Sequence, residues 1–218
     1  MATVVDPTIA PDRLADFEIR PGTLLQYLET RPETGPRIKC LEGSVTLVSP
    51  GRSHESQTSR LDRLIAAVCL ELGIEHAALA STTWTLPDGA DDTAYEADLA
   101  YYVQNFGKEK PDQPPDLAVE VVVSHPEKKA LRAGEVLKIP EMWVYDVPRR
   151  RLTFHHRTAR GKYRGVYRPG PRSRAFPFLT AAEVAERLDD PAPGETAFFR
   201  NCQEWSRRVL RPRLQFGD

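Results

Sequence analysis

Apolar side chains recur every three or four positions between residues 53 and 72, the spacing of a helix that packs one face against a core. Ser53 is a candidate N-cap at its start, and Gly73 follows its end, where a left-handed residue often terminates a helix. Cys69 lies on the apolar face. We therefore expect a long helix here, with Cys69 in the core and not acting as a nucleophile.

Strands are predicted on both sides of this helix. They cover residues 38–50 as a hairpin that turns at Glu42 and Gly43, then 76–86, 93–103, 116–124, 141–147, 151–157 and 162–168. The strand 116–124 contains the run LAVEVVV, which is typical of a strand covered on both faces. A helix predicted over 127–138 links it to 141–147, and this order favours parallel pairing of the two strands.

These elements predict an α/β protein with a mixed central sheet flanked by helices. Residues 1–35 are rich in proline and polar residues, with one short helical candidate at 22–30, and are expected to be an N-terminal extension. Residues 36–180 form the expected domain. Residues 181–218, with helices at about 180–188 and 195–209, form an expected C-terminal helical extension.

The net charge of −1 over 218 residues hides a strong asymmetry. Residues 1–146 hold 14 basic and 24 acidic residues, a net of −10, whereas residues 147–182 hold ten basic residues and no acid. Aromatic residues alternate with the arginines of this second segment, a composition suited to phosphates and to stacking on bases. An edge hairpin protected by exposed arginines explains the same pattern equally well. The residues expected to bind nucleic acid are Arg149, Arg150, Arg151, Arg157, Arg160, Lys162 and Arg164.

Several classes of protein do not agree with the sequence. No apolar run approaches the ~20 residues of a membrane span, so a membrane protein is excluded. The first residues lack the pattern of a secretion signal, and three cysteines do not suggest a disulfide framework. We expect a cytoplasmic protein.

Glu120 is the residue that points most directly to chemistry. It lies among valines, where an unpaired carboxylate is costly unless a cation, a metal ion or a proton compensates its charge. Asp98 lies in the strand predicted before it, with Glu96 two residues earlier. If the two strands are neighbours, Asp98 and Glu120 converge on one divalent cation, with Glu96 as a third oxygen ligand. The alternative is that an arginine pairs with Glu120 for structural reasons alone.

The order and spacing of five segments resemble the Uma-type restriction endonuclease family of the PD-(D/E)xK nuclease superfamily. The segments are SVTLVSPGRSHESQTSRLDRLI, YEADLAYYV, PPDLAVEVVVS, the lysine-bearing helix and IPEMWVYDV, within about residues 37–158. The resemblance implies a restriction-endonuclease-like fold. It also implies a Mg²⁺ or Mn²⁺ site at Asp98 and Glu120, with the backbone carbonyl of Val121 as a further ligand. The residue before Asp98 is Ala97, where the family pattern has proline.

The resemblance also implies a catalytic lysine and a histidine. The superfamily lysine stands two residues after the glutamate, where this chain has Val122. In the Uma-type branch it lies on the following helix, at the position of Ala130 here, so Lys129 and its neighbour Lys128 are the nearest candidates. His54 matches a histidine at the start of the family's first long helix.

Together these features predict a Mg²⁺-dependent endonuclease that hydrolyses DNA, and the resemblance makes a homodimer an expectation. Two alternatives stay open. One is a catalytically degenerate member of the fold that binds nucleic acid or a protein partner, and the other is a metal-dependent hydrolase of a smaller phosphorylated substrate.

Overall fold

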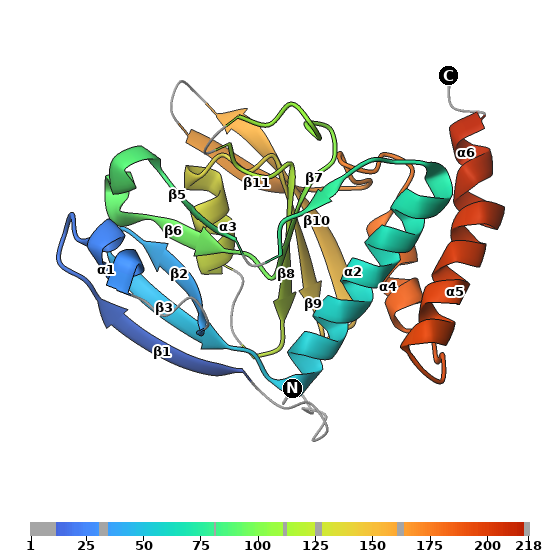
Figure 1. Ribbon diagram of the computed structural model, residues 1–218, viewed down its shortest axis with the longest axis horizontal. Helices are drawn as coiled ribbons and strands as arrows, with labels where there is room; N and C mark the ends of the chain where they lie inside the picture. The colour runs from blue at the N-terminus through green and yellow to red at the C-terminus, as the bar shows by residue number, and fades with distance from the viewer. Residues whose placement is uncertain are drawn as a thin grey trace.

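The computed structural model describes residues 12–30, 35–80, 82–110, 113–124, 128–160 and 164–215. Its strands form two sheets, which stand side by side in Figure 1. The five-stranded sheet is antiparallel and has the order β1 (Arg13–Glu18), β3 (Ser44–Ser49), β2 (Arg37–Leu41), β6 (Ala94–Glu96), β5 (Thr83–Thr85). The six-stranded sheet has the order β11 (Arg164–Gly170), β10 (Arg151–Arg160), β9 (Glu141–Asp146), β8 (Leu117–Val122), β7 (Leu99–Tyr102), β4 (Ala77–Ala78).

The helices cover the two sheets. Their bounds are α1 (Leu24–Thr30), α2 (Arg52–Leu72), α3 (Lys128–Val136), α4 (Ala181–Leu188), α5 (Glu195–Trp205) and α6 (Arg211–Gln215). Helix α3 lies between the two sheets, whereas α2, α4 and α5 lie on the other side of the six-stranded sheet (Figure 1). No helix in the described part of the chain is both long and apolar enough to cross a membrane.

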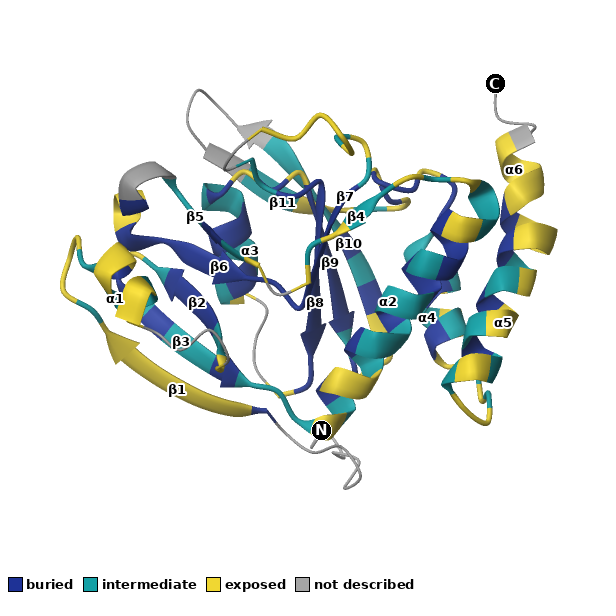
Figure 2. Ribbon diagram, viewed as in Figure 1, coloured by how far each residue is buried: buried dark blue, intermediate teal, exposed yellow. Residues whose placement is uncertain are grey.

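The predicted α/β class with a mixed sheet is confirmed, because β8 and β9 are parallel and their neighbours β7 and β10 are antiparallel to them. All six residues of β8 are buried, and β8 and β9 form the dark interior of Figure 2. As predicted, alternate residues of β8 lie on opposite faces of the six-stranded sheet. Leu117, Val119 and Val121 pack into the core beneath α2, while Ala118 packs towards α3.

The helix predicted at residues 53–72 is α2, and it ends at the left-handed Gly73 as expected. Cys69 is buried in the core, and burial raises the pKa of its thiol to about 12, so it is no nucleophile. The expected cap at Ser53 is wrong. The N-cap is Gly51, two residues before Ser53, and the helix begins at Arg52.

Two predicted strands are broken in the structure. The strand predicted over 93–103 runs as β6 and β7, which belong to different sheets, because the chain leaves the five-stranded sheet at Ala97 and Asp98. The strand predicted over 76–86 is likewise divided into β4 and β5. The single central sheet expected from the sequence is therefore two sheets joined at Asp98, and this junction positions the candidate site.

Both predicted hairpins are present. Glu42 and Gly43 have φ angles of 51° and 83°, so both turn residues are left-handed, as a tight hairpin turn requires. The arginine-rich hairpin is formed by β10 and β11, whose residues pair from Phe154 and Gly170 to Arg160 and Arg164.

The regions predicted as extensions contribute to the packing. Strand β1 pairs along its whole length with β3 and forms an exposed edge. The buried Leu24 of α1 packs against apolar residues of the five-stranded sheet. At the other end of the chain, α4, α5 and the π-helical turn at Ser206–Leu210 place Leu188, Phe198 and Leu210 in the main core.

Candidate active site

Asp98 and Glu120 lie next to each other at the junction of the two sheets. Strands β7 and β8 are antiparallel neighbours, as the metal-site prediction required, with Leu99 opposite Val119. Continuing this register places Asp98 opposite Glu120. Asp98 is 3% exposed and Glu120 is fully buried, so two carboxylates share one interior region where each charge needs compensation.

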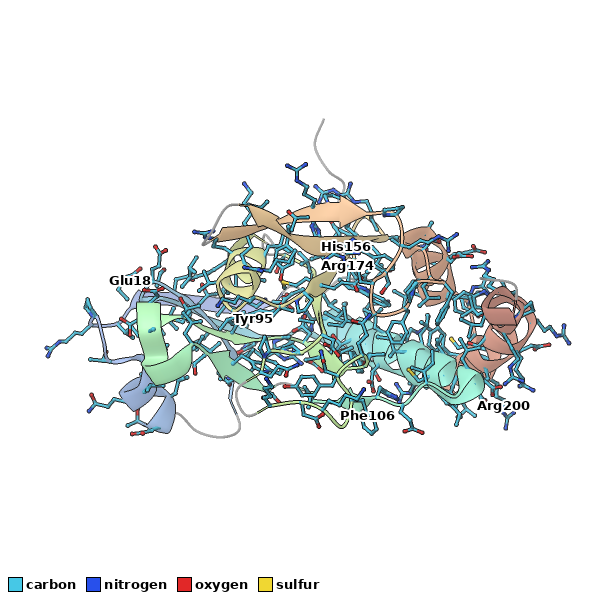
Figure 3. The ribbon with its side chains drawn as sticks, turned by 90° about the horizontal axis from the view of Figure 1, so that it is seen from above. Glu18, Tyr95, Phe106, His156, Arg174 and Arg200 are labelled. Carbon is cyan, nitrogen blue, oxygen red and sulfur yellow. The ribbon has the colours of Figure 1, made fainter. Side chains whose placement is uncertain are left out.

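Lys39 of β2 supplies a cation to Glu120. Its ammonium lies 2.5 Å from Oε2 of Glu120, and the Tyr95 hydroxyl donates to Oε1 at 2.5 Å. Tyr95 is fully buried, and its label lies amid the crowded side chains of Figure 3. Burial raises the pKa of Glu120, the charge of Lys39 opposes this change, and the nearby Asp98 adds to it. The pKa of Glu120 is raised overall, because burial outweighs the charge of Lys39.

Asp98 has three donors. Arg37 donates to Oδ1 at 2.8 Å, while Nε2 of His54 lies 3.0 Å from Oδ2 and the Val121 backbone N–H donates to the same oxygen at 2.7 Å. Burial by itself would raise the pKa of Asp98. The hydrogen bond to His54 and the neighbouring positive charges outweigh it and lower the pKa to about 2. Asp98 is therefore an anion at neutral pH.

His54 reaches this cluster from the first turn of α2. Its ring is buried, and its backbone carbonyl accepts a hydrogen bond from Thr58 one turn later. Burial alone would lower the pKa of His54, but the hydrogen bond and charge of Asp98 raise it overall. The adjacent Glu55 is instead half exposed and pairs with Arg37 at 3.2 Å.

Glu96 and Val121, the other predicted ligands, border the pair. A carboxylate oxygen of Glu96, on β6, accepts a hydrogen bond from the Ile38 backbone N–H at 3.2 Å. The Glu96 carboxylate therefore contacts β2 at the residue between Arg37 and Lys39. The Val121 N–H points towards Asp98. In an extended strand the carbonyl of a residue points to the same side as its N–H, so the Val121 carbonyl also lies on the Asp98 side.

The lysines predicted on the helix have other surroundings. Lys129 donates to the Thr46 hydroxyl at 2.8 Å and to Ser44 at 3.3 Å, both on β3, and burial lowers its pKa. Lys128 is exposed at the first position of α3, and Ala130 is packed in the small core beneath the helix. Neither hydrogen bond of Lys129 runs to a carboxylate.

Three of the seven predicted nucleic-acid-binding residues have partners within the protein. Arg149 pairs with Asp146 at 2.6 Å, Arg150 lies 3.8 Å from Asp189, and Arg157 donates to the Glu135 carbonyl at 3.2 Å. Arg151 is exposed on β10. Arg160 and Arg164 are the paired end residues of the hairpin strands, and Lys162 lies outside the described residues.

Sequence reasoning missed the two cations of the site, Arg37 and Lys39. Lys39 alternates with Ile38 and Cys40 along β2, and a lysine at such a position is solvent-exposed in a sheet covered on one side only. Here that face is covered as well, so Lys39 is only 3% exposed. The sequence offered one signal for Lys39: a lysine alternating with apolar residues in a strand whose neighbour, β6, ends in the acidic Glu96.

Comparisons with known proteins place the chain in a family. The family model "Uma2: Putative restriction endonuclease" matches residues 24–182, and the chain belongs to this family. A search of curated proteins found no match. Among solved structures, the chain is similar to one described as "a putative nuclease belonging to DUF820" from Anabaena variabilis, with 12% identity and a TM-score of 0.45, over 84% of this chain and 98% of that one.

The residues present fit the Mg²⁺ ion that this family implies. Within the described ranges no three His, Cys, Asp or Glu side chains already converge as a metal cluster. However, Mg²⁺ is commonly held by one or two carboxylates, its own waters and substrate phosphates. A carboxylate offers about four lone-pair sites. Two are used at Glu120 and three at Asp98, which leaves both able to accept a further partner.

The charge of the cluster also suits a divalent cation. Four carboxylates, those of Glu55, Glu96, Asp98 and Glu120, surround the two cations Arg37 and Lys39. With all four carboxylates ionised, the six side chains carry an excess of two negative charges before His54 is counted.

Proposed function

We propose that this chain is a Mg²⁺-dependent endonuclease that hydrolyses phosphodiester bonds of DNA. One observation carries the proposal: two buried carboxylates from adjoining strands, Asp98 and Glu120, lie together with a lysine ammonium directly on one of them. Two carboxylates can hold a metal ion that activates water, and a lysine can donate to the charge that develops on the phosphate. The family to which the chain belongs carries the description "Putative restriction endonuclease".

Asp98 and Glu120 would hold the ion, with the Val121 carbonyl and Glu96 beside them. When bound, Mg²⁺ would supply Lewis acidity towards the phosphate and lower the pKa of a coordinated water. The protein contributes ionised ligands in fixed positions. Arg37 and His54 keep Asp98 charged and oriented, and the Tyr95 hydroxyl fixes the carboxylate of Glu120.

Lys39 is our candidate for the catalytic lysine. The helix position implied by the resemblance is Ala130, whereas Lys39 reaches the same glutamate from β2. An ammonium at this place can orient the attacking water or donate to a phosphate oxygen that gains negative charge. The water-excluding valines around Glu120 strengthen that interaction, because charge is screened less in a buried site.

A cleavage assay on plasmid DNA tests the proposal. Wild-type protein with Mg²⁺ or Mn²⁺ should nick or linearise the plasmid, and EDTA should stop the reaction. Asp98→Asn and Glu120→Gln, which keep side-chain size and remove charge, should each lower the rate by at least about 100-fold, the scale of losing one electrostatic catalytic group. Glu204→Gln, an exposed carboxylate on α5, is the matched control. Equal rates in all four proteins would refute the proposal.

The second candidate is a member of the fold that binds nucleic acid without cutting it. The observation in its favour is that Arg37 and Lys39 already neutralise Asp98 and Glu120, which gives a buried cluster that is stable without an ion. Salt-sensitive DNA binding with no metal-dependent cleavage would support this reading.

A further inference from the structure

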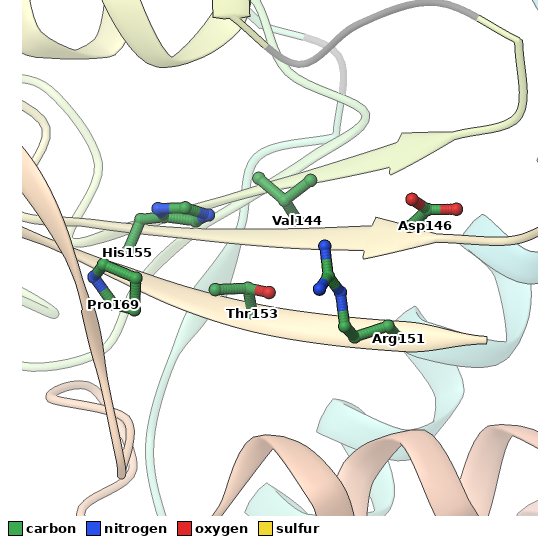
Figure 4. A pocket seen from close by; sticks show the side chains of 6 residues that line it. All are labelled: Val144, Asp146, Arg151, Thr153, His155 and Pro169. Atoms are coloured by element: carbon green, nitrogen blue, oxygen red, sulfur yellow. The ribbon is translucent and has the colours of Figure 1, made fainter. Parts of the chain in front are cut away.

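A pocket of about 350 Å³ lies on the outer half of the six-stranded sheet (Figure 4). Side chains from three adjacent strands line it: Val144, Asp146, Arg151, Thr153, His155 and Pro169. It occupies the carboxyl end of β9, which runs parallel to β8.

The pocket shares a sheet face with Glu120. Glu120 is the register partner of Val144, and Val144 is the register partner of Thr153. Cross-strand partners project to the same face of a sheet, so these three residues form one row across β8, β9 and β10. Two strand spacings of about 4.8 Å separate the ends of the row, which places Thr153 roughly 10 Å from Glu120.

Positive charge in the pocket comes from Arg151. Its side chain is exposed, and it makes no ion pair with any other residue in the described ranges. The acid opposite it in the register, Asp146, is matched by Arg149, whose backbone N–H and guanidinium both donate to its carboxylate. Arg151 therefore keeps an uncompensated charge at the pocket, and the Thr153 hydroxyl on the same face adds a neutral donor.

We propose that this pocket binds a backbone phosphodiester of the DNA strand that is cut at Asp98 and Glu120. The bound phosphodiester lies close to the bond that is cut. The guanidinium of Arg151 and the hydroxyl of Thr153 are the donors. Arginine suits this ligand because its planar fork donates two parallel hydrogen bonds to a phosphate. The inference rests on the function proposed above and adds to it the path of the substrate, from the acidic centre across β9 to β10.

The first experiment measures binding of a fluorescent DNA duplex by anisotropy in EDTA, where cleavage does not occur. Arg151→Ala is compared with Arg200→Ala, which removes an equal charge from the exposed face of α5, at the far end of the molecule (Figure 3). Arg151→Ala should weaken binding about fivefold or more and reduce the slope of log affinity against log salt by about 1, whereas Arg200→Ala should change neither. Equal behaviour of the two variants would overturn the subsite.

A second experiment locates the phosphate. Duplexes that each carry one neutral methylphosphonate linkage are compared for wild type and Arg151→Ala. One linkage position should weaken binding of the wild type, and the same position should have no effect on Arg151→Ala, because the two changes remove the same contact. Position effects that are identical in both proteins would contradict the assignment.

The two proposals fail differently. If wild-type protein cleaves DNA and Arg151→Ala behaves like Arg200→Ala, the phosphate subsite is wrong and the nuclease function stands. If wild-type protein neither binds nor cleaves the duplex, both proposals are wrong. If inorganic phosphate at millimolar concentration displaces the duplex from the wild type but no linkage position depends on Arg151, the pocket takes free phosphate and the strand assignment is overturned.

Discussion

Lys39 on β2 and Glu120 on β8 form a buried ion pair that joins the two sheets, with the ammonium 2.5 Å from the carboxylate. Neither side chain is more than 4% exposed. A buried pair of this kind adds little stability over apolar residues of the same size, but losing one partner leaves the other charge uncompensated. Stability alone therefore does not explain why the pair is present, which agrees with a functional role at the sheet junction.

Removal of Lys39 alone should destabilise the protein strongly. Lys39→Met leaves Glu120 buried without its cation, and we expect a loss of about 3–5 kcal/mol in the free energy of unfolding at neutral pH. The double variant Lys39→Met with Glu120→Gln should recover to within about 2 kcal/mol of wild type, because no unpaired charge remains. Urea unfolding of the four proteins of this cycle gives the values. Additive losses in the double variant would show that the two residues do not interact.

The two candidate lysines can be separated by cleavage rate. Lys129→Ala removes hydrogen bonds to Ser44 and Thr46 only, so cleavage should stay within about threefold of wild type. Lys39→Gln should lower the rate by at least about 100-fold, since it removes the cation at Glu120. The rates are measured on folded protein, verified by circular dichroism. The reverse order of effects would assign the catalytic lysine to α3.

Much of the architecture was predictable because it follows from local patterns. The helical spacing of α2 and the left-handed turn at Glu42 and Gly43 each depend on a few adjacent residues. The parallel pairing of β8 and β9 followed from their order around a helix. The break between β6 and β7 was not predictable, because alternation continues through Ala97 and Asp98. The chain passes from one sheet to the other there, and the Asp98 side chain accepts a hydrogen bond from the Val121 N–H.

The free energy contributed by Glu183 should depend on pH. This residue completes the capping box of α4 with Thr180 and pairs with Arg213 at 2.6 Å. The hydrogen bond from Arg213 is the main reason that its pKa falls to about 2 from the ordinary value of 4.5. A folded pKa below the unfolded one gives stability that is present above about pH 4.5 and is lost as the pH falls towards 2.

Glu183→Gln should therefore cost about 1 kcal/mol at pH 7 and progressively less at about pH 4 and pH 3. Urea unfolding at the three pH values measures the difference from wild type. Glu186→Gln, an exposed neighbour on the same helix, should show no such trend. A cost for Glu183→Gln that is constant with pH would mean that its charge contributes nothing.

Gly134→Ala should destabilise the protein, against the usual effect of this change in a helix. Alanine favours a helix interior over glycine by up to about 1 kcal/mol. At Gly134 of α3, however, an added Cβ would lie 2.8 Å from the Tyr167 hydroxyl and even closer to the Met142 sulfur. We expect a net loss of about 1–3 kcal/mol in urea unfolding, because the overlap exceeds the gain in propensity. An increase in stability would show that α3 shifts freely on the sheet.

Only part of the candidate site was predictable, because the rest depends on contacts between residues that are far apart in the chain. Asp98, Glu120 and His54 could be identified from the resemblance and from the burial of a carboxylate among valines. Which of 30 basic residues would compensate that carboxylate could not be identified, since the choice depends on how the five-stranded sheet covers β8. Lys39 and Glu120 are 81 residues apart in the chain, and no local pattern connects them.

A crystal of the full chain soaked in Mn²⁺ gives the most direct test of the proposed metal centre, through the anomalous difference map. We predict one strong peak between the carboxylates of Asp98 and Glu120, at about 2.2 Å from an oxygen of each, with the Lys39 ammonium moved away from Glu120. A map with no peak there, at a Mn²⁺ concentration that supports cleavage, and with Lys39 still bound to Glu120, would contradict the proposal.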